Sequence, residues 1–247
     1  MKSTFLIFVL LFLGISPHIF GQTSQGVILY EMRMDMHRTL PANRADLRNM
    51  IPQFRTDTFQ LIFSPTASIY KPQEVTPAQS AAGGGGGMRM MRMPRTETFI
   101  DKVTRQRRVF LEFLGRNILI DDTLQIDAWR IGNETMVIAG HVCLMAWQKD
   151  TVNNVEITAW FAPKLPPFQG PDRFGTLPGT VLAVDINNGE RVWVARRIDL
   201  REVKPEEILK PTRGDVMTRK EFNQFIEAQR QRMNQNAPGS GAMLRVF

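Results

Sequence analysis

Short stretches in which apolar and polar residues alternate recur throughout this sequence of 247 residues. Every even-numbered residue from Ile28 to Met36 is apolar, whereas the odd-numbered residues from Glu31 to His37 are charged or polar. Successive side chains of a β-strand point to opposite faces of a sheet, so this pattern predicts a half-buried strand. Turn-forming pairs such as Gly132-Asn133 separate such stretches. The pattern restricts the chain to a fold built mainly from short strands.

The expected fold is mainly β: a curved, largely antiparallel sheet or a partly closed barrel, with two helices. A short helix is expected near residues 43–50, because Pro52 stops it. A second helix is expected near 218–233, because Thr218 to Glu221 form a capping box. One apolar stripe on this helix indicates docking on the sheet or, alternatively, a partner-binding helix. The expected strands are 27–37, 58–63, 67–71, 97–102, 107–114, 118–121, 125–131, 134–138, 141–148, 155–161, 181–186 and 191–200.

The N-terminus has the pattern of a secretory signal peptide. Lys2 precedes an apolar run from Phe5 to Ile15, and Gly21-Gln22 supplies a small residue before a polar one. The run is shorter than the roughly 20 residues of a membrane-spanning helix. We therefore expect a signal peptide over residues 1–21 and export to the periplasm or the periplasmic face of the outer membrane. An uncleaved anchor is the alternative, and no later segment is expected to span a membrane.

Charge and composition narrow the class further. The chain has 31 Lys and Arg against 24 Asp and Glu, a net charge of +7, spread along the predicted strands. Nucleic-acid-binding proteins gather basic residues on one face, so nucleic acid is not an expected partner. The lone Cys143 lies in an apolar stretch and is expected to be buried. We expect one β-rich domain over residues 22–216, with a disordered Gly/Met-rich loop at about 72–95, and a C-terminal helix and flexible tail over 217–247.

Residues 170–184 contain three glycines and two prolines and lead into an apolar strand. Pro178-Gly179 predicts a type II turn, because that turn favours proline at its second position and glycine at its third. No Lys-Ser/Thr pair follows the glycines, so a phosphate-binding loop is not expected here. We expect this signature loop to close the mouth of the sheet or, alternatively, to dock a ligand or partner. Its candidate site residues are Gly170, Pro171, Gly175, Leu177, Pro178 and Gly179.

The signature loop belongs to a longer tract, from about Ile126 to Leu200. The tract contains, in this order, Trp129, Gly140, Cys143, Ala146, Trp160 and Gly175-Thr176-Leu177-Pro178-Gly179. It resembles the GLPGLI family, a group of exported proteins of Bacteroidetes-type bacteria with no settled activity. His141 departs from the aromatic residue of that family, and Thr176 and Thr180 make the motif less apolar. The resemblance implies an envelope protein whose genes are often found beside outer-membrane nutrient-uptake receptors.

Methionine is frequent, with 14 residues, and its thioether is a soft ligand suited to Cu(I). The candidate metal ligands are Met32, Met34, Met36, His37, Met88, Met90, Met91 and Met93. Alternating methionines on a strand are also ordinary core packing, and neighbouring arginines of the second cluster oppose a cation. A periplasmic carrier of an apolar ligand or a soft metal ion such as Cu(I) is therefore an alternative function. We expect no cofactor.

No catalytic residue is predicted. His37 and His141 lie on separate strands without metal-ligand spacing, and the sequence contains no Gly-x-Ser-x-Gly elbow. We expect a non-enzymatic envelope protein, accessory to outer-membrane uptake or assembly systems, with an outer-membrane receptor or another envelope protein as its partner. A hydrolase is the second alternative, and it requires one of these histidines beside a serine and an aspartate.

Overall fold

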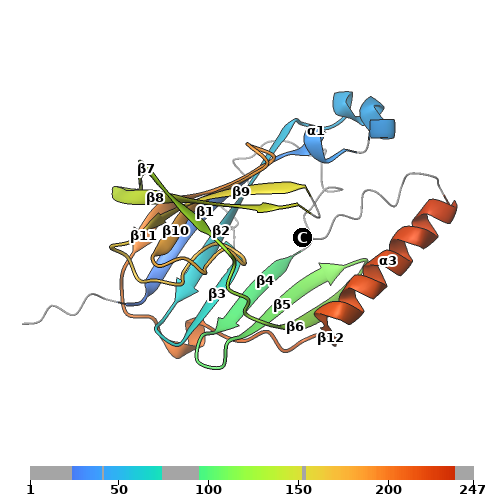
Figure 1. The fold of residues 1–247 in the computed structure, drawn as a ribbon. Helices are drawn as coiled ribbons and strands as arrows, with labels where there is room; N and C mark the ends of the chain where they lie inside the picture. The colour runs from blue at the N-terminus through green and yellow to red at the C-terminus, as the bar shows by residue number, and fades with distance from the viewer. Residues whose placement is uncertain (1–23, 41, 74–94, 152–153, 237–247) are drawn as a thin grey trace, which may run out of the picture.

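The computed structural model describes residues 24–40, 42–73, 95–151 and 154–236. These residues form one sheet in the order β12-β6-β5-β4-β3-β2-β1-β11-β10-β9-β8-β7 (Figure 1). Neighbouring strands are antiparallel, except that β12 runs parallel to β6. The strands are β1 (Gly26–Asp35), β2 (Phe54–Phe63), β3 (Ala67–Pro72), β4 (Thr96–Asp101), β5 (Gln106–Phe113), β6 (Arg116–Thr123), β7 (Arg130–Ile138), β8 (His141–Asp150), β9 (Val155–Ala162), β10 (Thr180–Ile186), β11 (Arg191–Asp199) and β12 (Asp215–Thr218).

The main hydrophobic core lies within the curved sheet. It contains buried side chains from β1–β3, β7–β11 and the loop between β9 and β10. Tyr30 and Val184 are completely buried there. The two edge strands, β12 and β7, do not pair with each other, so the sheet stays open. The expected mainly β fold with a curved, largely antiparallel sheet is confirmed.

Among the described residues, four helical segments accompany the sheet: α1 (Met36–Thr39), the 3-10 helices η1 (Ala42–Asn49) and η3 (Pro205–Glu207), and α3 (Arg219–Asn236). The helix expected near 43–50 is therefore present in the tighter 3-10 form. The capping box of α3 is also present: Glu221 N donates to Thr218 Oγ1 at 3.2 Å, and Thr218 N donates to the Glu221 carboxylate at 2.7 Å. Among the described residues, no helix is both long and apolar enough to cross a membrane.

The chain after β11 crosses the sheet and positions α3. Val203 packs against Ile62, Ile69 and Phe99, so this segment covers β2–β4. It then places β12 alongside β6, and α3 follows directly. Phe222 and Ile226 of α3 are buried against β5 and β6. The helix thus docks on the sheet, which was the first of the two expectations for it, and its apolar side chains form one cluster with those of β5 and β6.

Several predicted strands have different bounds in the structure: β2 begins earlier than expected, at Phe54, and the strands expected over 125–131 and 134–138 are one strand, β7. The strand expected over 27–37 ends at Asp35, whose carboxylate accepts hydrogen bonds from the backbone of His37 and Arg38 and caps α1. The turn expected at Gly132-Asn133 is wrong, because β7 runs through it with a register shift between Ile131 and Thr135. The strand expected over 125–131 begins only at Arg130. Most of the loop expected at about 72–95 lies outside the described residues.

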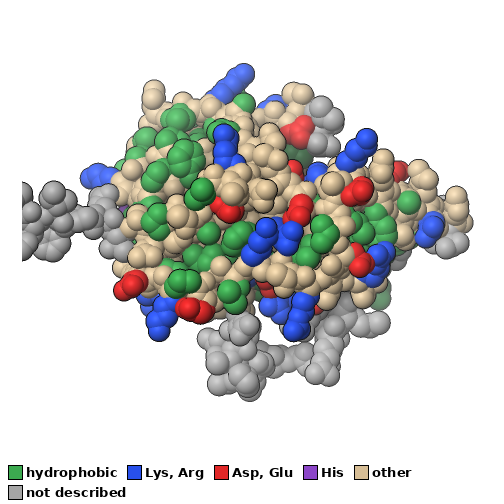
Figure 2. Space-filling view, turned by 90° about the horizontal axis from the view of Figure 1, so that it is seen from below, with side chains coloured by type: hydrophobic (Ala, Val, Ile, Leu, Met, Phe, Trp, Pro, Cys, Tyr) green, Lys and Arg blue, Asp and Glu red, His purple; other side chains and the backbone are tan. Residues whose placement is uncertain are grey.

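The surface charge is dispersed. Figure 2 shows the molecule from below the view of Figure 1, with Lys and Arg side chains spread over this face and Asp and Glu side chains between them. The exposed ion pairs include Arg196–Glu31 and Arg116–Asp215, each at 2.6 Å. Such pairs contribute only about 0–1 kcal/mol each to stability. On this face, the basic residues do not form the continuous stripe typical of a nucleic-acid interface.

Candidate functional site

The signature loop connects β9 to β10 and packs into the main core. Phe174 and Leu177 are about 2% and 1% exposed. The Phe174 ring lies 5.7 Å from the Trp193 ring, between centroids. Of the six candidate residues, only Pro178 is exposed. The other five are buried: Gly170, Pro171, Gly175, Leu177 and Gly179. Burial gives these five residues a packing role.

The type II turn predicted at Pro178-Gly179 is wrong. Such a turn requires a positive φ at its third residue, and Gly179 does not have one. Glycine is needed here for a different reason: a Cβ at this position would lie 2.5 Å from the carbonyl oxygen of Ala162. Gly170 has the same property, since a Cβ there would lie even closer to the carbonyl oxygen of Phe174. The glycines of this loop allow close approach of two backbone segments.

The two threonines that distinguish the signature loop are buried and hydrogen-bonded. Thr180 Oγ1 donates to the carbonyl oxygen of Pro166 at 2.6 Å. Trp129 Nε1 donates to Thr176 Oγ1 at 3.0 Å, and Thr176 Oγ1 donates to the Asp127 carboxylate at 3.2 Å. Burial raises the pKa of Asp127, although the Thr176 hydrogen bond acts against that rise. These bonds tie the loop to the segment that precedes β7.

The first methionine group lies in and around the core. Met32 and Met34 are buried, and Met36 packs against the same cluster. The His37 ring is directed elsewhere, with Nε2 at 3.0 Å from the carbonyl oxygen of Ile51. A carbonyl is an acceptor only, so Nε2 carries the proton in this contact. Apolar packing therefore accounts for Met32 and Met34.

The second methionine group (Met88, Met90, Met91 and Met93) lies outside the described residues. Within the described part of the chain, no group of three or more His, Cys, Asp or Glu side chains could hold a metal ion. Cys143 is buried, as predicted, and burial raises the pKa of its thiol to about 11. In the described ranges, no hydrogen bond joins the ring of His37 or His141 to a serine or a carboxylate.

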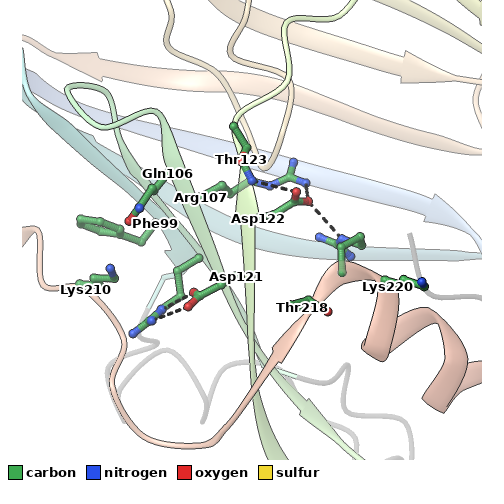
Figure 3. Close-up of a pocket in the computed structure, with 11 residues that line it drawn as sticks. Phe99, Gln106, Arg107, Asp121, Asp122, Thr123, Lys210, Thr218 and Lys220 are labelled. Carbon is green, nitrogen blue, oxygen red and sulfur yellow. Dashed lines mark hydrogen bonds and ion pairs between the residues drawn. The ribbon is translucent and has the colours of Figure 1, made fainter.

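A pocket of about 420 Å³ opens where β12 ends and α3 begins (Figure 3). It exists because β12 is shorter than β6: their pairing stops at Thr218–Asp121, and the chain turns away into α3. Asp122 and Thr123, the last residues of β6, therefore have no strand neighbour on that side among the described residues. The charged residues that line the pocket are Arg107, Arg108, Lys210, Arg219, Lys220, Asp121 and Asp122.

The two carboxylates of the pocket are held in ion pairs. Arg108 donates to both oxygens of Asp121, at 2.6 and 2.7 Å, and this fork holds the pKa of Asp121 below its usual value. Asp122 accepts from Arg107 at 2.7 Å and from Arg219 at 3.2 Å. Burial alone acts to raise the pKa of Asp122, but these hydrogen bonds and the charge of Arg107 lower it overall. Both carboxylates are therefore ionised at neutral pH.

The pocket was not predicted from the sequence, in which Asp121 and Asp122 lie only at the end of the strand expected over 118–121. A local signal existed. Arg107-Arg108 and Asp121-Asp122 are equidistant from Leu114-Gly115, whose positive φ angles of 49° and 75° form the hairpin turn of β5 and β6. A two-residue hairpin of this kind places each arginine opposite one aspartate. The contribution of α3 has no comparable signal, because it depends on long-range pairing of β12 with β6.

Comparison with known proteins relates part of the chain to a family. Residues 147–183 match the family described as "Protein of unknown function (Porph_ging)". This segment runs from β8 through β9 and the whole signature loop into β10. No curated protein matches the sequence.

Two solved structures share the fold. "Structure of PNGF-II in P21 space group" superposes with a TM-score of 0.57 at 14% identity and covers 84% of this chain. "Structure of PNGF-II in C2 space group" gives a TM-score of 0.56, also at 14% identity, over 83% of this chain. The chain spans about a third of the length of those proteins, 34% and 33%. Likeness at this identity concerns the fold alone.

Proposed function

We propose that the chain is an exported, non-enzymatic interaction protein of the cell envelope that binds its partner at the free edge of the sheet. The signal-peptide pattern before residue 22 supports export. The segment matched by the family of unknown function contains the Gly175 to Val181 motif, which supports membership of the GLPGLI group. An envelope protein that accompanies outer-membrane uptake or assembly systems is the role consistent with these features.

The observation that carries the proposal is the exposed apolar surface of β7 and β8. Val137 and Val142, which face each other in the β7–β8 pairing, are 67% and 58% exposed. Ile131, Met136 and Trp147 of the same two strands are also more than a third exposed. Met136 lies on the opposite face from Val137, because neighbouring residues of a regularly paired strand point to opposite faces. Contiguous exposed apolar residues at one place are typical of interaction sites.

The backbone of β7 offers a second element of recognition. β7 is the last strand of the sheet, so one of its edges has no strand neighbour among the described residues. Natural edge strands are commonly protected by lysine or proline, and β7 contains neither. The segment Thr135–Ile138 lies beyond the register shift and pairs regularly with β8.

The partner is therefore an extended, mainly apolar segment of another envelope protein. It adds to β7 through main-chain hydrogen bonds and packs its side chains on the exposed valines. The β7 strand carries Arg130 and Glu134, whose charges cancel, so a strongly charged segment is not favoured.

Affinity purification from envelope fractions of the native host tests this proposal. The Val137→Lys variant places a charge on the edge, and the Val103→Lys variant makes the same substitution at a valine 73% exposed in the β4–β5 turn. We expect an envelope protein to be retained by the parent and by Val103→Lys, and to be reduced at least about tenfold in Val137→Lys. Equal recovery with both variants, or no partner above background with the parent, would rule out docking at β7.

A further inference from the structure

The pocket between β6 and α3 has more positive charge than its own carboxylates balance. Five cationic side chains and two carboxylates line it, an excess of three positive charges. Both carboxylates are already paired with arginine, and the Nε atom of Arg107 is buried without an acceptor. Among the described residues, the ammonium groups of Lys210 and Lys220 have no ion-pair partner within 4.0 Å. The pocket thus has hydrogen-bond donors without acceptors.

The position of the charges explains how the pocket can hold an anion. Arg107 and Asp122 lie opposite each other on β5 and β6, as do Arg108 and Asp121. Because neighbouring residues of a strand point to opposite faces, the two ion pairs lie on opposite faces of the sheet. Lys210 and Lys220 lie on opposite sides of this arrangement in Figure 3. The ion pairs fix the arginines, and the lysines remain available.

We propose that this pocket binds the phosphate group of a ligand. Near neutral pH a free phosphate or phosphate monoester carries about two negative charges and a phosphodiester about one, and each has several acceptor oxygens, which suit donors that come from different directions. A metal cation is excluded by the charge of the lining. A pocket of about 420 Å³ also has room for more than the phosphate itself, since ligand sites typically measure roughly 300–1,000 Å³.

Two additional features favour an anion at this place. Arg219 and Lys220 occupy the first turn of α3, where the positive end of the helix dipole disfavours cations. Asp122 compensates Arg219 at 3.2 Å, but no acidic group in the described part of the chain compensates Lys220. A bound phosphate would supply that compensation. This site lies on β5, β6 and α3, so it is independent of the β7 edge.

The phosphate can belong to a soluble ester or to a phospholipid headgroup, and two arms distinguish these sources. Isothermal titration calorimetry of the purified chain with inorganic phosphate tests the soluble source. Co-sedimentation with phosphatidylglycerol vesicles, compared with phosphatidylcholine vesicles, tests the lipid source. Binding in the first arm assigns the pocket to soluble phosphates, and selective binding to phosphatidylglycerol assigns it to headgroups.

The decisive comparison is between two variants that each remove two positive charges. Lys210→Gln/Lys220→Gln removes the unpaired cations of the pocket, whereas Lys164→Gln/Lys204→Gln removes exposed lysines elsewhere. All four side chains are exposed, so both variants should fold, which circular dichroism verifies. We expect affinity to fall at least about tenfold in the pocket variant and to stay within about twofold of the parent in the other, since screened distant charges contribute little. Equal losses in the two variants, or no binding by the parent in either arm, would overturn the proposal.

Discussion

Gly179 lies against the backbone of Ala162, and no larger residue fits without a shift of one of the two segments. In a Gly179→Ala variant, the new methyl group would lie 2.5 Å from the Ala162 carbonyl oxygen and 2.9 Å from the Phe161 ring. Overpacking of this kind costs about 1–3 kcal/mol. We therefore expect the free energy of unfolding, measured by urea titration, to fall by that amount.

Gly132 provides the matched control for this substitution. A methyl group there would meet only the terminal methyl of the Met145 side chain, at 2.9 Å, which can rotate away. Gly132→Ala should therefore cost clearly less than Gly179→Ala. If both variants lost the same stability, the close approach to Ala162 would not be the reason for glycine in the signature loop.

At the level of elements, the sequence predicts best where the signal is local. The alternation that predicted β1 and the capping box that predicted the start of α3 both depend on residues within a few positions of one another. Gly132-Asn133 was misleading, because an edge strand can absorb an irregularity as a register shift. β12 was missed, because a four-residue strand that pairs only with β6 leaves almost no periodic pattern.

The attachment of α3 to the sheet depends chiefly on Phe222, which is 1% exposed and lies in a cluster with Ile118 and Ile120. A Phe222→Ala variant removes the whole of that buried ring and leaves a cavity, which typically costs about 3–5 kcal/mol. We expect α3 to unfold at a lower urea concentration than in the parent. The far-ultraviolet circular dichroism signal of the helix measures this unfolding. Asn223→Ala, an exposed neighbour on the same turn, should have little effect. A helix that stays as stable in Phe222→Ala as in Asn223→Ala would show that it is held by other contacts.

For the molecule as a whole, the sequence predicted the architecture but not the pocket. A sheet requires only that each strand carry the right periodicity, and that information is distributed along the chain. The pocket instead requires residues near 107 and near 219 to meet, which follows from the crossing segment and the parallel β12–β6 pairing. The signature loop shows the same limit. Its glycines were recognisable, but the Ala162 backbone that requires Gly179 becomes apparent only in the folded chain.

The distribution of hydrophobic residues also determines how the whole molecule opens. Counted over the residues that the structure describes, the main core contains 24 buried residues, whereas the cluster beneath α3 contains six. Continuous hydrogen bonding across the sheet favours one cooperative unit, but burial of apolar area contributes more, at about 25 cal/mol per Å². We therefore expect β12 and α3 to open locally while β10 opens only on global unfolding.

Hydrogen exchange followed by mass spectrometry measures these openings separately. Amides of Val181–Val184 in β10 should exchange slowest, and those of β12 and α3 should exchange faster by at least about tenfold, equivalent to 1.4 kcal/mol. Phe222→Ala should accelerate amide exchange in α3 and β6, because it removes the side chain that packs between them. The amides of Val181–Val184 should still exchange only through global unfolding. Identical opening free energies in β10 and α3 would mean that sheet hydrogen bonding, rather than the unequal cores, governs cooperativity. In that case the pocket, which is built from both β6 and α3, would be as rigid as the main core.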